Sequence, residues 1–265
     1  SVAAAMVFSM AACGNTGTGN NAGNASESSS AAAENTSKKD NKKLTKITFC
    51  LDGTPNTNHT GLYVAQQLGY YEQEGLDVQI VQPPEDGAAL MCSAGQAQFA
   101  IAAQDTMAAS LDSDAPLNIT AVAAVLQHNT SGIMSRKGDG IDTPAGMTGK
   151  TYSTWESPIE LATLETVVNE DGGDFSKVKL IPNDITDEPA ALAAHQTDAI
   201  WVFYGWGGIN AKQENTDCDF FFFKDINPVF DYYTPVIIAN NTFLQEHPDI
   251  AKKFLEATQK GYELS

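Results

Sequence analysis

Hydrophobic and polar positions along this chain follow two periods that alternate from about residue 46 onward. Short apolar or alternating runs predict strands, and apolar residues spaced three or four apart predict helices. The expected elements are strand 46–51, helix 60–69, strand 76–81, helix 86–94, strand 98–102, helix 104–112 and strand 118–127. This regular alternation predicts an α/β fold.

The alternation resumes after a turn rich in glycine and charge at residues 136–140. We expect strand 149–154, helix 157–171, strand 177–181, helix 187–195, strand 198–203, helix 206–215 and, beyond a phenylalanine run, strand 234–239 and helix 249–262. A body of roughly 220 residues exceeds one average domain, and 42% of the whole chain is hydrophobic, which is enough for a real core. The pattern therefore predicts two α/β units.

The most informative loop lies between strand 46–51 and helix 60–69 and contains Asp52, Gly53, Asn56 and His59. In open α/β sheets, ligands bind at the carboxyl ends of the strands. We therefore expect residues 52–59 to line a pocket.

The amino end predicts an exported protein. Residues 2–12 form an apolar run too short to span a bilayer, and Met10-Ala11-Ala12-Cys13-Gly14 has the form of a lipoprotein cleavage site. We interpret residues 1–13 as the remnant of a signal peptide and Cys13 as the lipidated residue; a random apolar end with a buried Cys13 is the alternative. Residues 14–44, without aromatics, predict a flexible tether. With no basic region ahead of residue 2 and a helical pattern still running at residue 265, we expect a chain truncated at both ends.

The net charge and the distribution of Arg, Lys, His and Cys argue against several kinds of ligand. The net charge of −18 argues against a nucleic-acid partner, because nothing would neutralise phosphates. Few Arg or Lys residues fall in the candidate loops, so a neutral or cationic ligand is favoured over a phosphate or sulfonate. The four histidines are scattered and predict no metal site. If Cys13 carries lipid, Cys50, Cys92 and Cys218 remain, and buried single thiols are favoured over a disulfide.

Four separate segments together resemble one family. They are residues 51–65, Gly69 to Val78, Gln127 to Gly132, and Tyr204-Gly205-Trp206. Together they resemble the solute-binding lipoproteins of ABC importers for thiamine pyrimidine precursors, from about residue 43 to the last residue. The resemblance implies the type II periplasmic-binding-protein fold, with one lobe at 45–132 and 236–265, the other at 133–235, and hinge crossings near 133–135 and 233–236.

The same resemblance implies how such a protein works. A monomer, tethered by lipid to the outer face of a bacterial cell membrane, would close its lobes on a small solute, an aminopyrimidine-like heterocycle, and deliver it to an ABC permease in that membrane. No cofactor and no catalytic residue is expected.

The pocket chemistry follows from the residue types. Asp52 can accept paired hydrogen bonds from the amidine-like edge of an aminopyrimidine, or it initiates a turn and caps its own loop. Asn56 and His59 offer donors and acceptors from the same loop. Gln104 follows a third strand end, and Ser131 either faces the cleft or satisfies the crossing backbone.

Two further segments contribute candidates from the second unit. Trp155, Glu156, Ser157 and Glu160 follow strand 149–154. The capping arrangement Ser157-x-x-Glu160 explains the last two without a ligand, so both readings stay open. At the end of strand 198–203, Tyr204 and Trp206 suit stacking on a planar heterocycle, whereas for Trp201 and Phe203 we favour core packing.

Two alternatives remain for function. In the resembled family an aromatic residue follows the loop Asp, and Gly53 removes that ring, so another planar heterocycle such as riboflavin stays open as the ligand. A fungal pyrimidine-precursor synthase shares the fold and a similar Thr-Pro-x-x-x-His loop, present here at Thr54, Pro55 and His59. Its cysteine-rich run is absent from the matching residues 231–235, which favours a binding protein over an enzyme.

Overall fold

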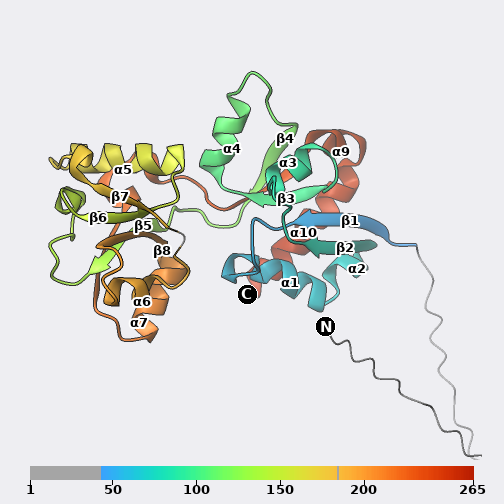
Figure 1. The fold of residues 1–265 in the computed structure, drawn as a ribbon. Coiled ribbons are helices and arrows are strands. Elements are labelled where there is room, and N and C mark those ends of the chain that lie inside the picture. The colour runs from blue at the N-terminus through green and yellow to red at the C-terminus, as the bar shows by residue number, and fades with distance from the viewer. Residues whose placement is uncertain (1–42, 184) are drawn as a thin grey trace, which may run out of the picture. The chain divides into compact units, whose positions relative to one another are not determined.

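The computed structural model describes residues 43–183 and 185–265. The predicted signal remnant at 1–13 with Cys13, and the predicted tether up to residue 42, lie outside the described residues. Within them the predicted α/β class is confirmed, since two five-stranded sheets each carry their own helices (Figure 1).

The first sheet has the strand order β2-β1-β3-β10-β4. Its strands are β1 (Thr45–Cys50), β2 (Leu76–Val81), β3 (Phe99–Ala102), β4 (Ile119–Ala124) and β10 (Val236–Asn240). Strand β1 pairs in parallel with β2 and β3, whereas β10 runs antiparallel to β3 and β4. The sheet is completed by a strand that arrives from far along the chain, as expected for strand 234–239.

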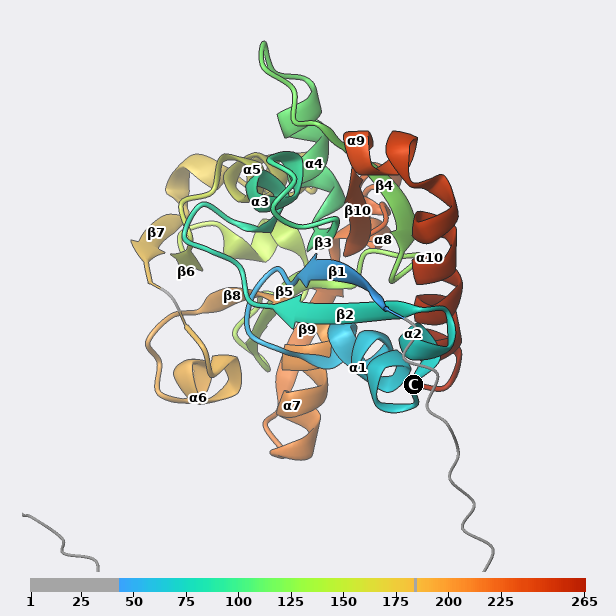
Figure 2. The same cartoon turned by 90° about the vertical axis from the view of Figure 1, so that its right-hand side faces the viewer.

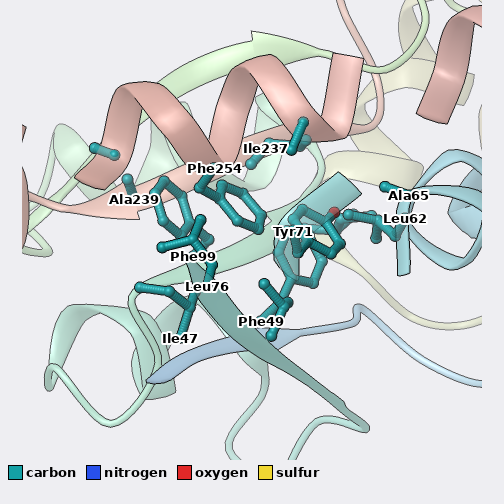
Figure 3. Packing of buried hydrophobic residues seen from close by; sticks show 14 of the residues in the cluster. Ile47, Phe49, Leu62, Ala65, Tyr71, Leu76, Phe99, Ile237, Ala239 and Phe254 are labelled. Atoms are coloured by element: carbon teal, nitrogen blue, oxygen red, sulfur yellow. The ribbon is translucent and has the colours of Figure 1, made fainter. Parts of the chain in front are cut away.

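The helices that belong to this sheet are α1 (Thr60–Gln67), α2 (Tyr70–Gln73), α3 (Ala88–Ser93), α4 (Gln104–Leu111), α9 (Asn241–Glu246) and α10 (Pro248–Glu263). We call the first sheet and these helices lobe 1. Figure 2 shows α10 running beside α1 and α2. In the core, the Phe254 ring of α10 stacks on Phe99 at 4.1 Å and on Tyr71 at 5.4 Å between ring centroids (Figure 3). This packing fixes the last helix against the front half of the lobe.

The second sheet has the order β7-β6-β8-β5-β9. Its strands are β5 (Ser131–Arg136), β6 (Thr151–Thr154), β7 (Lys179–Pro182), β8 (Ala199–Phe203) and β9 (Cys218–Phe222), and its helices are α5 (Pro158–Glu170), α6 (Glu188–Ala193), α7 (Ile209–Gln213) and α8 (Phe223–Ile226). We call this sheet and its helices lobe 2. Strands β6 and β8 are parallel, so their carboxyl ends share one edge of the sheet.

Two strands of lobe 2 differ from expectation. Residues 133–135, where a hinge crossing was expected, lie inside β5, which is buried between β8 and β9. The phenylalanine run, which was assigned no element, forms most of β9. Strand β5 follows β4 without a helix between them, so it lacks the strand-then-helix alternation on which the prediction relied.

The chain passes between the sheets in residues 125–130 and again in residues 227–235. The Val125 N–H donates to the Pro235 carbonyl oxygen at 3.0 Å, beside lobe 1. Near lobe 2, Asn129 Nδ2 donates to the Phe230 carbonyl oxygen at 2.9 Å, and His128 Nδ1 lies 2.9 Å from Asp231 Oδ2. The two passages are therefore tied to each other at both of their ends.

Candidate ligand-binding site

A cleft of about 660 Å³ lies where the loop after β1 faces the end of β8. Lobe 1 contributes the loop residues Asp52, Gly53, Thr54, Asn56, Thr57 and Asn58 together with Ala103; the passages contribute Leu126, Thr130, Thr234 and Pro235; lobe 2 contributes Phe203, Gly205 and Trp206. The volume lies within the range usual for small-molecule sites. Asp52 is the one charged residue among the described residues that line this cleft.

Asp52 is held by a buried histidine. The His59 side chain is fully buried, and its Nε2 lies 2.8 Å from Asp52 Oδ1. The Asn56 N–H donates to His59 Nδ1 at 3.1 Å. Because Nδ1 accepts this bond, the ring proton resides on Nε2 and is donated to Asp52. His59 therefore supports the carboxylate from behind and does not line the cleft, which is a correction to its expected ligand contact.

Asn56 lines the cleft but its side chain is used within the loop. Its Oδ1 accepts from the Asn58 N–H at 2.9 Å, which caps the short helix Thr57–His59, and its Nδ2 donates to the Thr54 carbonyl oxygen at 3.3 Å. These bonds shape the turn that carries Asp52, and a ligand contact by Asn56 would compete with them.

The aromatic wall of the cleft differs in part from the predicted one. Trp206 lines the cleft as expected and is 55% exposed. Phe203, assigned to the core from the sequence, also lines it and is 45% exposed, because β8 ends there and a π-helical turn begins at Tyr204. Tyr204 turns away, packing at 5.1 Å from Phe220 between ring centroids. Phe203 thus takes the place predicted for Tyr204.

Two predicted site residues are buried inside lobe 2. Glu160 is 3% exposed, and its carboxylate accepts bonds from the Tyr152 hydroxyl at 2.6 Å and from the Ser157 N–H at 3.2 Å. Burial and Glu160 together raise the pKa of Tyr152 far above its usual value, so this hydroxyl stays a donor. Ser131 is 1% exposed and donates to Asn129 Oδ1. The expected ligand contacts of Ser131 and Glu160 are thereby corrected to structural roles, whereas the ligand contact of Ser157, which is half-buried, remains a prediction.

Trp155 and Glu156 lie at the edge of the second sheet where β6 ends, beside the end of β8. Trp155 is 48% exposed, and Glu156 has a φ of 61°, in the left-handed region. Neither residue lines the cleft, although both occupy the same sheet edge as Phe203. Their contact with a ligand remains a prediction.

Gln104 at the start of α4 binds the second passage instead of the cleft. Its Oε1 accepts from the Tyr233 N–H at 2.8 Å, and the neighbouring Asp105 Oδ2 accepts from the Tyr232 hydroxyl at 3.0 Å. Burial and Asp105 raise the pKa of Tyr232 far above its usual value. Gln104, which was expected to line the cleft, therefore secures the passage that borders it, together with Asp105.

The described residues contain no cluster of His, Cys, Asp and Glu that could hold a metal ion. Cys50 and Cys92 are buried free thiols, and burial raises the pKa of Cys50 to about 11 and that of Cys92 to about 12. Both stay protonated near neutral pH, in agreement with the prediction of buried single thiols. Of the helices in residues 43–183 and 185–265, none has the length and apolarity needed to cross a membrane.

The arrangement of two sheets around a cleft defines the fold class. The periplasmic aliphatic sulphonate-binding protein SsuA from Escherichia coli superposes with a TM-score of 0.60 at 14% sequence identity, covering 83% of this chain and 73% of that one. The fold is therefore that of type II periplasmic binding proteins, as the resemblance implied.

Sequence comparison gives the family. Residues 56–265 match the NMT1/THI5-like family, and the chain belongs to it. The formylaminopyrimidine-binding protein of Halalkalibacterium halodurans is 32% identical over 246 residues, covering 88% of this chain and 70% of the relative. The 4-amino-5-hydroxymethyl-2-methylpyrimidine phosphate synthase of Schizosaccharomyces pombe is 27% identical over 235 residues, covering 80% of this chain and 63% of that protein.

Proposed function

We propose that this protein is the solute-binding component of an ABC importer and captures a thiamine pyrimidine precursor of the formylaminopyrimidine type. The observation that carries the proposal is the cleft wall, where the Asp52 carboxylate faces a site whose other wall presents the Phe203 and Trp206 rings. An aminopyrimidine is a planar ring with an amidine-like donor edge. The carboxylate would accept from the donor edge, and the aromatic rings would stack on the planar ring.

The charge of the cleft favours this ligand class over anions. Asp52 is the one ionisable group among the described lining residues, and no described Lys or Arg borders the cleft. A sulfonate or phosphate would meet a carboxylate without a compensating cation, which is unfavourable in a site of reduced dielectric. A protonated or amidine-like edge would instead form a charge-assisted hydrogen bond to Asp52.

Rings on the lobe 2 side support a flat solute. Phe203 and Trp206 are 45% and 55% exposed and both line the cleft, so their rings are available to a solute. Stacking of such a ring on a heterocycle contributes about 0.5–1.5 kcal/mol beyond burial of area. Another planar heterocycle, riboflavin included, is the alternative ligand.

The relatives support a role in uptake. One is named as a formylaminopyrimidine-binding protein, and a two-lobed fold with a cleft suits capture and delivery. Delivery would be to an ABC permease that recognises the closed form. Lipid attachment at Cys13, with residues 14–44 as a tether at the outer face of the membrane, belongs to the same proposal.

A synthase activity is the competing function, because other relatives are named as synthases. His59, the residue shared with the synthase-like loop, is fully buried and has both ring nitrogens engaged. It could act on a ligand only if the loop rearranged. This geometry supports a binding role for the loop.

Isothermal titration calorimetry with formylaminopyrimidine, thiamine, riboflavin and taurine tests the proposal. We expect formylaminopyrimidine to bind with 1:1 stoichiometry and to raise the melting temperature as its concentration rises, and the sulfonate taurine to give no heat. Binding of riboflavin alone would keep the fold and overturn the ligand. Release of a pyrimidine phosphate during incubation would favour the synthase.

A further inference from the structure

The loop that carries Asp52 is fastened from the far end of the chain. The hydroxyl of Tyr262, near the end of α10, donates to the carbonyl oxygen of Asn58 at 2.7 Å, across a separation of 204 residues. Asn58 lies in the cleft wall, and the next residue is the buried His59. The last helix therefore contacts the loop at the point where the loop becomes α1.

The contact depends on an unusually close approach of two helices. A Cβ atom added to Gly61 of α1 would collide with the Tyr262 ring, and one added to Gly261 of α10 would collide with the Gly61 carbonyl oxygen. Both positions therefore need glycine for the ring to lie flat against α1. Figure 2 shows the lower part of α10 near α1 and α2.

Two hydrogen bonds, joined by the backbone between Asn58 and His59, lead from this contact to the cleft. Tyr262 holds the Asn58 carbonyl, the following His59 donates to Asp52 Oδ1 at 2.8 Å, and the Asn56 N–H fixes the imidazole through Nδ1. Burial, the neighbouring Tyr71 and the negative charge of Asp52 raise the pKa of Tyr262 far above its usual value. The hydroxyl thus remains a donor at every physiological pH. The charge of Asp52 contributes to the raised pKa, so the two side chains are close enough to interact electrostatically.

We propose that Tyr262 is a positioning residue for ligand binding: through Asn58 and His59 it fixes the direction in which Asp52 presents its carboxylate to the cleft. This inference rests on the proposed function, in which Asp52 binds the solute. Tyr262 lies outside the cleft lining, so any effect of its hydroxyl on affinity must be transmitted through the loop.

Lobe 1 offers a matched control for this test. Tyr71 is another buried tyrosine whose hydroxyl is bound at α10, 2.9 Å from Thr258 Oγ1, and among the described residues it forms no hydrogen bond to the loop. Tyr262→Phe and Tyr71→Phe each remove one hydroxyl from the same helix packing and keep the ring. Comparison of the two separates loss of stability from loss of loop position.

In titrations of the full chain with formylaminopyrimidine, we expect Tyr262→Phe to weaken binding about threefold to tenfold, the range that one net hydrogen bond supplies. The affinity of Tyr71→Phe should stay within about twofold of that of the unchanged protein. Its melting temperature should fall by about as much as that of Tyr262→Phe, because each variant loses one buried hydrogen bond. Unchanged affinity in Tyr262→Phe, or equal losses in both variants, would overturn the inference.

A ligand-free measurement keeps the two proposals separate. The ring nitrogens of His59 should report a single Nε2–H form by ¹⁵N NMR in the unchanged protein and in Tyr71→Phe, and a mixture of ring forms in Tyr262→Phe. An unchanged His59 spectrum in Tyr262→Phe would contradict the positioning role. If formylaminopyrimidine fails to bind the unchanged protein, the proposed function fails, and this spectrum alone still decides the role of Tyr262.

Discussion

His59 donates its Nε2 proton to Oδ1 of Asp52 at 2.8 Å from a fully buried position, and so fixes a partly exposed carboxylate at the edge of the cleft. Among the described residues, no hydrogen bond occupies the second oxygen, Oδ2. One oxygen of Asp52 is therefore used for position and the other is free for a solute.

Replacement of Asp52 by asparagine tests this division. In Asp52→Asn the amide oxygen still accepts from His59, so the loop should keep its shape, while the charge offered to the solute is lost. We expect formylaminopyrimidine affinity to fall by about 1–3 kcal/mol, the range for a hydrogen bond to a charged group. Calorimetry measures the affinity, and the same change at Asp86, which lies outside this cleft, is the control. Equal affinity of Asp52→Asn and the unchanged protein would remove Asp52 from the site.

Trp206 and Tyr204 should respond in opposite ways to truncation. Trp206→Ala removes an exposed ring of the cleft wall, so we expect affinity to fall by about 0.5–1.5 kcal/mol with little change in stability. Tyr204→Ala removes a ring packed on Phe220 and Phe222, and should lower the melting temperature with little effect on affinity. Titration and thermal unfolding of both variants check this, and a loss of affinity in Tyr204→Ala alone would reverse the assignment of the two rings.

The sequence predicted the parts of the fold that local pattern determines. Strand 76–81 and the start of α4 at Gln104 coincide with the observed elements, and the Asp52 loop was expected at the carboxyl end of β1 and is found there. Strand β5 was missed because it follows β4 without a helix between them and no long helix follows it. The hydrophobic pattern of a segment does not show which other strands it pairs with.

The direction of individual side chains was less accessible. Alternation along β8 correctly places Trp201 on the core side, but the π-helical turn at Tyr204 breaks the period and brings Phe203 into the cleft wall. The loop around His59 is held by a bond to Asp52, seven residues back in the chain, and by a bond from Tyr262 to Asn58, across 204 residues. Tertiary contacts of this kind leave no local signal.

Glu160 should prove to be a stability residue. Its carboxylate accepts from Tyr152, Thr154, Trp155 and Ser157 in a buried position. In Glu160→Gln the new amide N–H₂ faces donors, so we expect the free energy of unfolding to fall by about 2–3 kcal/mol because buried donors lose their acceptor. Urea denaturation measures this against Glu165→Gln, an exposed change on the same helix that should be silent. A lower affinity without a lower stability would return Glu160 to the ligand site.

Asp198 should make lobe 2 sensitive to acid. Burial by itself raises its pKa, but the Thr151 N–H and hydroxyl, at 2.8 and 2.7 Å, and Arg136 outweigh burial and hold the pKa below the usual value. A lowered pKa stabilises the fold above the unfolded value of about 4 and loses that stability as pH falls through the folded pKa. We expect Asp198→Asn to be less stable than the unchanged protein at neutral pH, with the gap closing below pH of about 4. Melting temperatures across this range check it, and parallel curves would contradict it.

Gly53 provides a test of how the cleft wall can be rebuilt. A Cβ atom at this position would meet no heavy atom within 4 Å, and its φ is not in the left-handed region, so a side chain fits without strain. Gly53 lines the same cleft as Trp206. We expect Gly53→Trp to fold with a melting temperature close to that of the unchanged protein and, by adding a stacking face, to bind formylaminopyrimidine more tightly by about 0.5–1.5 kcal/mol. Gly53→Ala, which adds no ring, is the control and should leave affinity unchanged. Weaker binding in Gly53→Trp alone would mean that the solute occupies the space beside Gly53, and that the absence of a side chain there is a requirement of the ligand.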